Sequence, residues 1–139
     1  MTVPLIEEPL DAVPGLPPGK EKGRGSMKLV SCIIRPERLE AVKDALNNLQ
    51  MVGGMTVTDV RGFGRQKGQV EHYRGGEYTI RFIPKVKVDI AVPAEDIDAV
   101  MAAVSQAART GQVGDSKIFV AEMLHAIRIR TGERGTSVL

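Results

Sequence analysis

Three segments of the sequence carry cationic side chains, two of them together with glycines, in patterns suited to binding anions. The first, residues 61–68, reads Arg-Gly-Phe-Gly-Arg-Gln-Lys-Gly. Its glycines let the backbone approach a ligand closely, and its Arg and Lys side chains supply charged donors for phosphate or carboxylate. The glycine spacing matches neither a Walker loop nor a dinucleotide-binding fingerprint. An anion-binding loop and a plain flexible basic loop therefore both stay open for this segment alone.

The other two segments lie nearer the C-terminus. Residues 110–117 read Thr-Gly-Gln-Val-Gly-Asp-Ser-Lys, a loop whose backbone amides and terminal ammonium group could hold phosphates. Residues 127–130 read Ile-Arg-Ile-Arg. On a strand, Arg128 and Arg130 would share one face as a polyphosphate clamp, while Ile127 and Ile129 would enter the core. Each segment alone also fits a turn or a solvent-facing strand, but three in one chain favour a phosphate site.

Metal and nucleophile chemistry have little support in the sequence. His72 and His125 are isolated, and no spacing of Cys, His and carboxylates suggests a structural metal. The single cysteine, Cys32, lies in an apolar run and is interpreted as a buried hydrophobe, which suits a reducing compartment. Tyr73 and Tyr78 fall in a long predicted loop, where a hydroxyl is accessible for docking or covalent modification.

Composition excludes several classes of protein. The net charge is only +2, from 19 basic and 17 acidic residues, whereas dedicated nucleic-acid binders carry a clear basic excess. No apolar stretch approaches the roughly 20 residues that span a bilayer, and no secretory signal is evident. We therefore expect a cytoplasmic protein with no direct nucleic-acid partner and no membrane insertion.

The chain changes composition near residue 26, and all three cationic segments lie after that point. Residues 1–26 hold five of the eight prolines and then a Gly- and Lys-rich run, so we expect a flexible extension. Residues 27–139 are expected to form one folded domain.

Hydrophobic periodicity predicts the elements of that domain. Strands are expected over 28–35, 55–61, 85–92, 118–120 and 126–130, with the even-numbered residues of 86–92 buried and Lys85 on the opposite face. Helical stripes comprise Leu39, Val42, Leu46 and Leu49, ending at the glycines of 53–54, and Ile97, Val100, Met101 and Val104. The order β-α-β-β-α-β predicts an α+β, ferredoxin-like domain. Its connection from 62 to about 80 exceeds ordinary loop lengths, which indicates a functional role.

At these same segments the sequence closely resembles the nitrogen regulatory protein P-II family. Matching runs fall at 55–68, 73–78, 84–87, 110–119 and 127–133, and the resemblance extends over 27–139. It implies a homotrimer of ferredoxin-like subunits that bind ATP or ADP in the clefts between neighbours. The nucleotide-binding positions it implies are Thr56, Gly62, Gly64, Arg65, Ala91, Gly114, Asp115, Ser116 and Lys117, with Arg128 and Arg130 from the adjacent subunit.

The resemblance also implies an effector site and a signalling role. It assigns 2-oxoglutarate, bound with Mg²⁺ and ATP, to Gln66, Lys67, Gly68 and Lys85, with Gln66 contributing to the metal. Tyr78 matches a tyrosine that is uridylylated in many bacterial members. The implied protein is a sensor of nitrogen, carbon and energy status. Its implied partners are ammonium transporters, nitrogen-metabolism enzymes and nucleotidyltransferases.

Two other functions were weighed against this non-enzymatic sensor. A slow ATPase could use Lys117, Arg128 and Arg130, but no residue is evident that would orient a nucleophilic water. A sensor of another small anion is less favoured because Gln66, Lys67 and Lys85 are retained. Two departures from the family pattern bear on the sites: Ser116 stands where glycine is common, and Glu37 where an aromatic residue is frequent.

Overall fold

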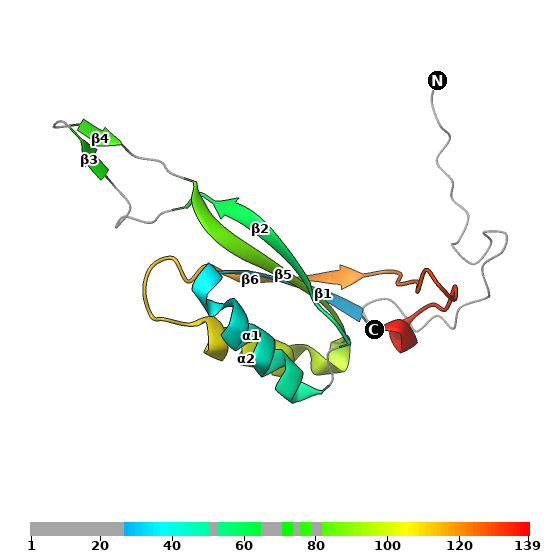
Figure 1. Ribbon diagram of the computed structural model, residues 1–139. Coiled ribbons are helices and arrows are strands. Elements are labelled where there is room, and N and C mark those ends of the chain that lie inside the picture. The colour runs from blue at the N-terminus through cyan, green and yellow to red at the C-terminus, as the bar shows by residue number, and fades with distance from the viewer. Residues whose placement is uncertain (1–26, 51–52, 65–70, 74–75, 79–81) are drawn as a thin grey trace, which may run out of the picture.

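The computed structural model describes residues 27–50, 53–64, 71–73, 76–78 and 82–139 (Figure 1). The predicted extension 1–26 lies outside the described residues. The main elements, in chain order, are β1 Met27–Ile34, α1 Leu39–Leu49, β2 Thr56–Gly62, β5 Ile83–Pro93, α2 Ile97–Ala108 and β6 Ile118–Met123. Short 3-10 turns, Pro36–Arg38 and Ala94–Asp96, lead into the two helices, and a third, Thr136–Val138, lies near the C-terminus.

The main sheet has four antiparallel strands in the order β2-β5-β1-β6. Both helices lie on the same side of this sheet (Figure 1). The arrangement confirms the predicted α+β fold and its ferredoxin-like order. β1 and β5 occupy the centre, while β2 and β6 form the two edges.

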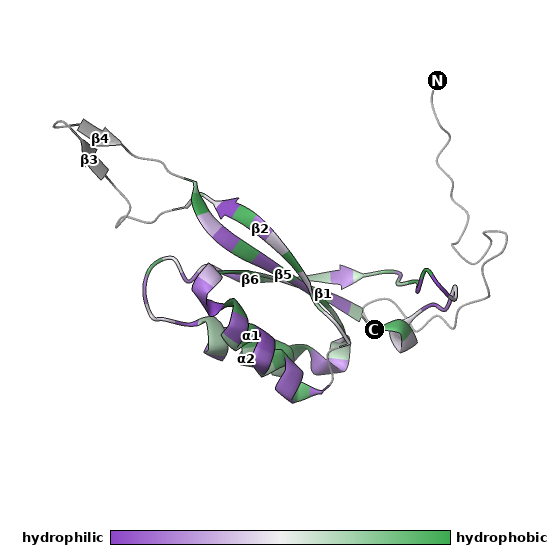
Figure 2. Ribbon diagram, viewed as in Figure 1, coloured by the Kyte–Doolittle hydropathy of each residue, from purple (hydrophilic) through white to green (hydrophobic). Residues whose placement is uncertain are grey.

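The hydrophobic core lies between the helices and the two central strands. Strand β5 buries its even-numbered residues from Val86 to Val92, as predicted from their alternation. Helix α1 contributes Val42 and Leu46, and α2 contributes Val100 and Val104, while polar residues follow the outer side of α1 (Figure 2). Cys32 is buried in this core, as predicted, and desolvation together with the nearby charge of Asp89 raises its pKa to about 11.

Local chain chemistry sets where α1 begins and ends. Pro36 starts the turn that leads into the helix, where its fixed φ is favourable and its missing N–H costs nothing. The helix ends at Leu49, because Gln50 adopts the left-handed conformation with φ 56°. The predicted end at the glycines of 53–54 was therefore a few residues too late.

The predicted strand over 126–130 was wrong. Only one bridge, between Ile127 and Arg134, forms there, and the chain turns back at once. The amides of Thr131 and Gly132 donate to the Arg128 carbonyl at 3.3 and 2.8 Å. Ile129 is 98% exposed rather than buried, so alternation did not predict its environment. Strand β6 in turn extends to Met123, beyond the predicted residue 120.

The long connection between β2 and β5 contains regular structure that the sequence did not predict. β3 Glu71–Tyr73 and β4 Gly76–Tyr78 pair as a two-stranded antiparallel sheet, with Glu71 opposite Tyr78. Both tyrosines therefore lie on strands rather than in an irregular loop. Within the part of the chain that the structure describes, no helix is long and apolar enough to cross a membrane.

Candidate anion-binding site

The face of the sheet opposite the helices carries several of the predicted binding residues. Residues paired directly across antiparallel strands share a face. Thr56 pairs with Asp89 and Gly62 with Ile83, so both lie on the face of β5 that also carries Lys85 and Ala91. The prediction that Lys85 lies opposite the core is confirmed. About 20 Å of strand separates Thr56 from Gly62, at ~3.3 Å per residue.

Lys85 lies at the centre of one end of this face. It is only 6% exposed, and its ammonium group donates to the carbonyl of Gly114. A Cβ on Gly62 would lie 3.2 Å from the Lys85 Cγ, so the glycine leaves room for the lysine stem beside β2. Desolvation lowers the pKa of Lys85, and the charge of Arg35 lowers it further, while Glu37 and Asp115 act in the opposite direction.

Asp115 closes the loop that follows α2. Its carboxylate accepts hydrogen bonds from the amides of Thr110 and Gly111, both at 2.8 Å, and from the Thr110 hydroxyl. A fourth donor is the Arg35 Nε, at 3.1 Å. The Thr110 hydroxyl leads these donors in holding the pKa of Asp115 well below its usual range, although desolvation acts in the opposite direction. We call residues 110–117 the Asp115 loop.

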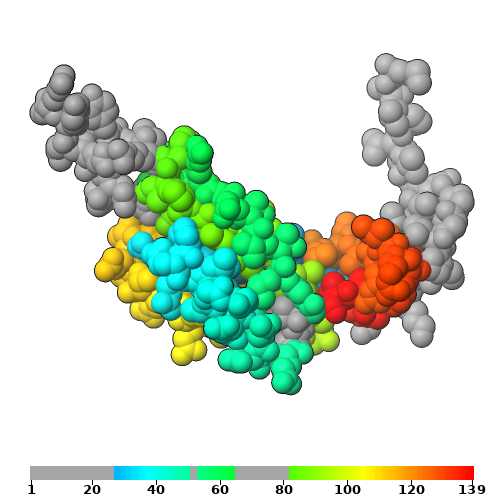
Figure 3. Space-filling model, in the orientation of Figure 1, coloured from blue at the N-terminus to red at the C-terminus, as the bar shows by residue number. Residues whose placement is uncertain are grey.

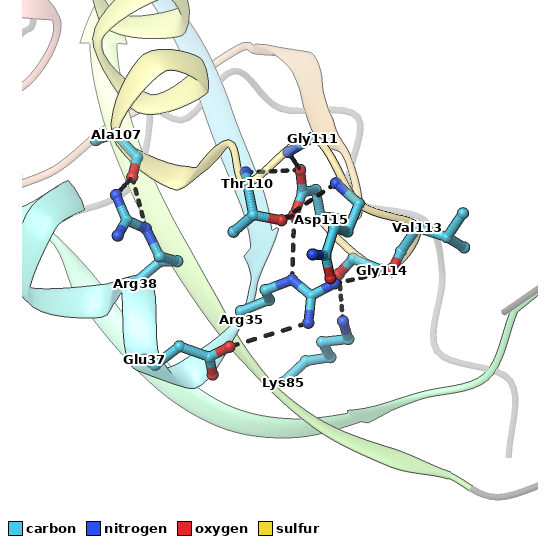
Figure 4. A network of polar contacts seen from close by, with 11 residues as sticks. Arg35, Glu37, Arg38, Lys85, Ala107, Thr110, Gly111, Val113, Gly114 and Asp115 are labelled. Atoms are coloured by element: carbon cyan, nitrogen blue, oxygen red, sulfur yellow. Dashed lines mark hydrogen bonds and ion pairs between the residues drawn. The ribbon is translucent and has the colours of Figure 1, made fainter. Parts of the chain in front are cut away.

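Arg35 joins this loop to the end of β1. Besides its contact with Asp115, its guanidinium donates to the Val113 carbonyl at 2.8 Å and lies 3.9 Å from the Glu37 carboxylate. Figure 4 shows Arg35 and Lys85 reaching toward the same short stretch of the loop. Sequence reasoning missed Arg35. Its position could have indicated this role. Arg35 directly follows the buried strand β1, and its alternation along that strand places it on the sheet face opposite the helices.

The backbone of the Asp115 loop departs from ordinary conformations at three positions. Gly111, Gly114 and Ser116 have φ values of 85°, 108° and 71°. At the third position Ser116 is strained, because an L side chain is disfavoured in the left-handed region. Among the residues that the structure describes, no acceptor takes the amides of Gly114, Ser116 or Lys117. Such amides can bind an anion.

Lys117 ends the loop and begins the pairing of β6. Its carbonyl accepts from the Ile33 amide at 3.0 Å, which fixes its backbone beside β1, while the residue itself is exposed. Gly62, Lys85, Gly114, Asp115 and the Lys117 backbone therefore meet at one end of the sheet. Gly64 follows β2 at that end, with open space around its Cα.

Arg128 and Arg130 do not join this group within one chain. They follow β6 at the opposite end of the sheet from the Asp115 loop, and the segment after β6 forms a separate lobe (Figure 3). Arg128 pairs with Glu133 at 3.0 Å, and Arg130 is exposed in the turn. The predicted parallel arrangement on a strand was wrong, because the turn at 128–132 breaks the alternation.

Several predicted residues lie outside the described residues, namely Arg65, Gln66, Lys67 and Gly68. The backbone of Tyr78 lies in β4. No group of three or more Cys, His, Asp or Glu side chains in the described ranges could hold a metal ion. At one end of the sheet, the described residues bring together the backbone amides of the Asp115 loop and the cationic side chains of Arg35 and Lys85.

Comparison with known proteins gives this arrangement a family. The family model described as "Nitrogen regulatory protein P-II" matches residues 27–133. The nitrogen regulatory protein GlnK of Escherichia coli K12 is 54% identical over 113 residues, covering 81% of this chain and 100% of the relative. The nitrogen regulatory protein P-II of Nostoc punctiforme is also 54% identical, with the same coverage.

A solved structure agrees with the sequence comparison. The crystal structure of Arabidopsis thaliana PII bound to citrate matches with a TM-score of 0.67 and 37% identity, covering 81% of this chain and 92% of that one. These relatives are named as regulatory proteins. The chain belongs to the nitrogen regulatory protein P-II family.

Proposed function

We propose that this protein senses nitrogen, carbon and energy status by binding ATP or ADP and 2-oxoglutarate, and that it signals through the connection between β2 and β5. The observation that supports this best is the Asp115 loop. Beside Lys85 it offers amides that meet no acceptor among the described residues, on the sheet face opposite both helices. Amides and ammonium groups are the donors that phosphates and carboxylates need.

The nucleotide would lie along the helix-free face. Its phosphates would bind Gly114, Ser116 and Lys117 at one end, together with Gly62, Gly64 and Arg65 from the end of β2. Thr56 and Ala91 lie about 20 Å further along the same face, at ~3.3 Å per strand residue, a span that an extended nucleotide can approach. Asp115 would support this loop rather than contact the ligand through its carboxylate.

The remaining cations would come from a neighbouring subunit of a homotrimer. Phe119 is 56% exposed on the helix-free face, where the register of β6 places Ala121 as well. Leu124 and Ile129 are also exposed. A subunit interface would cover these exposed apolar side chains. Within one chain, Arg128 and Arg130 lie at the far end of the sheet from the Asp115 loop. Assembly would therefore bring these arginines of one subunit to the nucleotide of the next.

The effector site would adjoin the phosphates. A dicarboxylate such as 2-oxoglutarate would bind the Lys85 ammonium group, now on the Gly114 carbonyl, and the segment of Gln66, Lys67 and Gly68. Mg²⁺ would be held by phosphate and keto-acid oxygens with the Gln66 side chain. That a plant relative binds citrate supports a carboxylate site in this family.

Signalling would follow from the different ligands. ATP with 2-oxoglutarate would favour one conformation of the long connection and ADP another, and partners would read the difference. Ammonium transporters, nitrogen-metabolism enzymes and nucleotidyltransferases are the partners we propose, in the cytoplasm. Uridylylation of Tyr78 would add a bulky anion to the docking surface. Residues 27–139 would form the sensor domain, with 1–26 as an extension.

Calorimetry with the full chain tests this function. We expect ATP to bind and 2-oxoglutarate to bind only when ATP and Mg²⁺ are present. Each ligand should strengthen the other, because coupling between sites is reciprocal. Binding of neither ligand, or independent binding, would contradict the proposal. Phosphate release at tens of turnovers per second would instead favour the ATPase.

A further inference from the structure

We propose that Arg35 is the positioning residue of the nucleotide site, acting through the Asp115 loop and not by touching the ligand. The inference deepens the proposed function and depends on it. It concerns a residue at the end of β1 that the sequence patterns did not single out.

The geometry of Arg35 is that of a two-point clamp. Its Nε donates to the Asp115 carboxylate at 3.1 Å and one terminal nitrogen donates to the Val113 carbonyl at 2.8 Å (Figure 4). These acceptors lie on either side of Gly114. Because a guanidinium is planar and rigid, two donors fix the orientation of the chain between them. A lysine in the same place would offer three rotatable N–H groups on a single nitrogen, without a planar fork to fix that orientation.

The clamp determines which groups of the loop face a ligand. The carbonyl of Val113 is bound to Arg35, the carbonyl of Gly114 to Lys85, and the carboxylate of Asp115 to four donors. These three acceptor groups are thus occupied by protein donors, whereas the amides of Gly114, Ser116 and Lys117 meet no acceptor among the described residues. An anion approaching the loop therefore meets donors and little competing negative charge.

A third contact of Arg35, which does not involve the loop, provides a control. The other terminal nitrogen of Arg35 lies 3.9 Å from the exposed carboxylate of Glu37, an ion pair on the opposite side from the loop. Exposed pairs of this kind contribute little. Glu37→Gln therefore changes the charge beside Arg35 without removing either bond to the loop.

The experiment measures ATP affinity of the full chain by calorimetry for wild type, Arg35→Met, Arg35→Lys and Glu37→Gln. We expect Arg35→Met to weaken ATP binding about tenfold, Arg35→Lys to weaken it less, and Glu37→Gln to leave it within about twofold. If wild type does not bind ATP, the proposed function fails. If wild type binds and Arg35→Met binds equally well, only the role of Arg35 fails.

A double-mutant cycle separates positioning from simple charge. If Arg35 acts through Asp115, the double variant Arg35→Met with Asp115→Asn should bind ATP only slightly more weakly than the weaker-binding of the two single variants. Combined with Lys117→Gln, which removes a separate phosphate donor, Arg35→Met should have an additive effect. Additivity with both partners would overturn the proposal, because it would indicate a long-range charge effect. Should Arg35→Met fail to fold, the same two cycles are run with Arg35→Lys.

Discussion

At the scale of single residues, the charged side chains of the site are held by hydrogen bonds to other groups of the protein. Asp115 carries a full set of donors, Lys85 is bound to a carbonyl, and Arg35 holds two acceptors. Sequence patterns identified the Asp115 loop as an anion-binding candidate, and the family resemblance added Lys85. They could not identify Arg35, because its role depends on where β1 ends relative to a loop some 80 positions away in the chain.

The depressed pKa of Asp115 predicts how the loop responds to acid. A carboxylate whose pKa is lower in the folded state stabilises the fold above its unfolded pKa, about 3.9, and this contribution is lost as the pH falls further. Asp115→Asn should therefore be less stable than wild type at pH 7, and the difference should shrink as the pH falls below about 4. Urea unfolding between pH 7 and pH 2 measures this difference.

The control for this titration is Asp44→Asn, which changes an exposed carboxylate on α1, away from the loop. Amide exchange at Thr110 and Gly111 gives a local readout, since both amides donate to Asp115. A stability difference that stays constant from pH 7 to pH 2 would contradict the assigned role of the carboxylate.

At the scale of elements, alternation and helical stripes predicted the core strands and both helices because burial repeats along them. The alternation of β5 over 86–92 and most of the stripes of α1 and α2 match the core residues, whereas Met101 is only partly buried and lies outside the core cluster. Alternation failed at 126–130, where Ile127 and Ile129 resemble a strand but Gly132, with φ 74°, lets the chain turn back. The pairing of β3 with β4 was missed for another reason, since three-residue strands are too short to show a period.

The best test of the α1 interpretation is Leu46→Ala. Leu46 is fully buried between the helix and the sheet, so its removal leaves a cavity. We expect the free energy of unfolding to fall by about 2–5 kcal/mol. Thermal or urea unfolding measures this loss.

Asn47→Ala is the matched control in the same helix, because Asn47 is exposed. It should change the free energy of unfolding by no more than about 0.5 kcal/mol. Equal losses for the two variants would show that α1 does not pack as described.

At the scale of the whole molecule, one subunit carries the parts of the proposed nucleotide site at two separate ends. The Asp115 loop lies at one end of the sheet, and the segment with Arg128 and Arg130 lies at the other (Figure 1). Sequence motifs could supply both parts but not their separation, which depends on the direction of β6. A site that uses both parts requires at least two subunits.

Phe119→Glu tests the face on which those subunits would meet. A carboxylate there would have to be desolvated on assembly, at a cost of several kcal/mol. Light scattering should give three copies per particle for wild type and one for the variant, with the circular dichroism of the sheet and helices retained. Glu122→Gln, on the same strand and exposed, should remain at three copies.

Two results would contradict this assignment. A wild-type particle of one copy would remove the trimer, and a trimeric Phe119→Glu would move the interface to another face. The latter result would leave the Asp115 loop and its clamp unaffected.

The edge position of β6 exposes a newly synthesised chain to aggregation. Its outer backbone groups and the exposed Phe119 have no partner strand within the sheet. An uncovered edge of this kind is a template on which any other extended chain can add. In the proposed trimer, assembly and aggregation would compete for the same strand, so fast association of the subunits would protect newly made chains from misassembly.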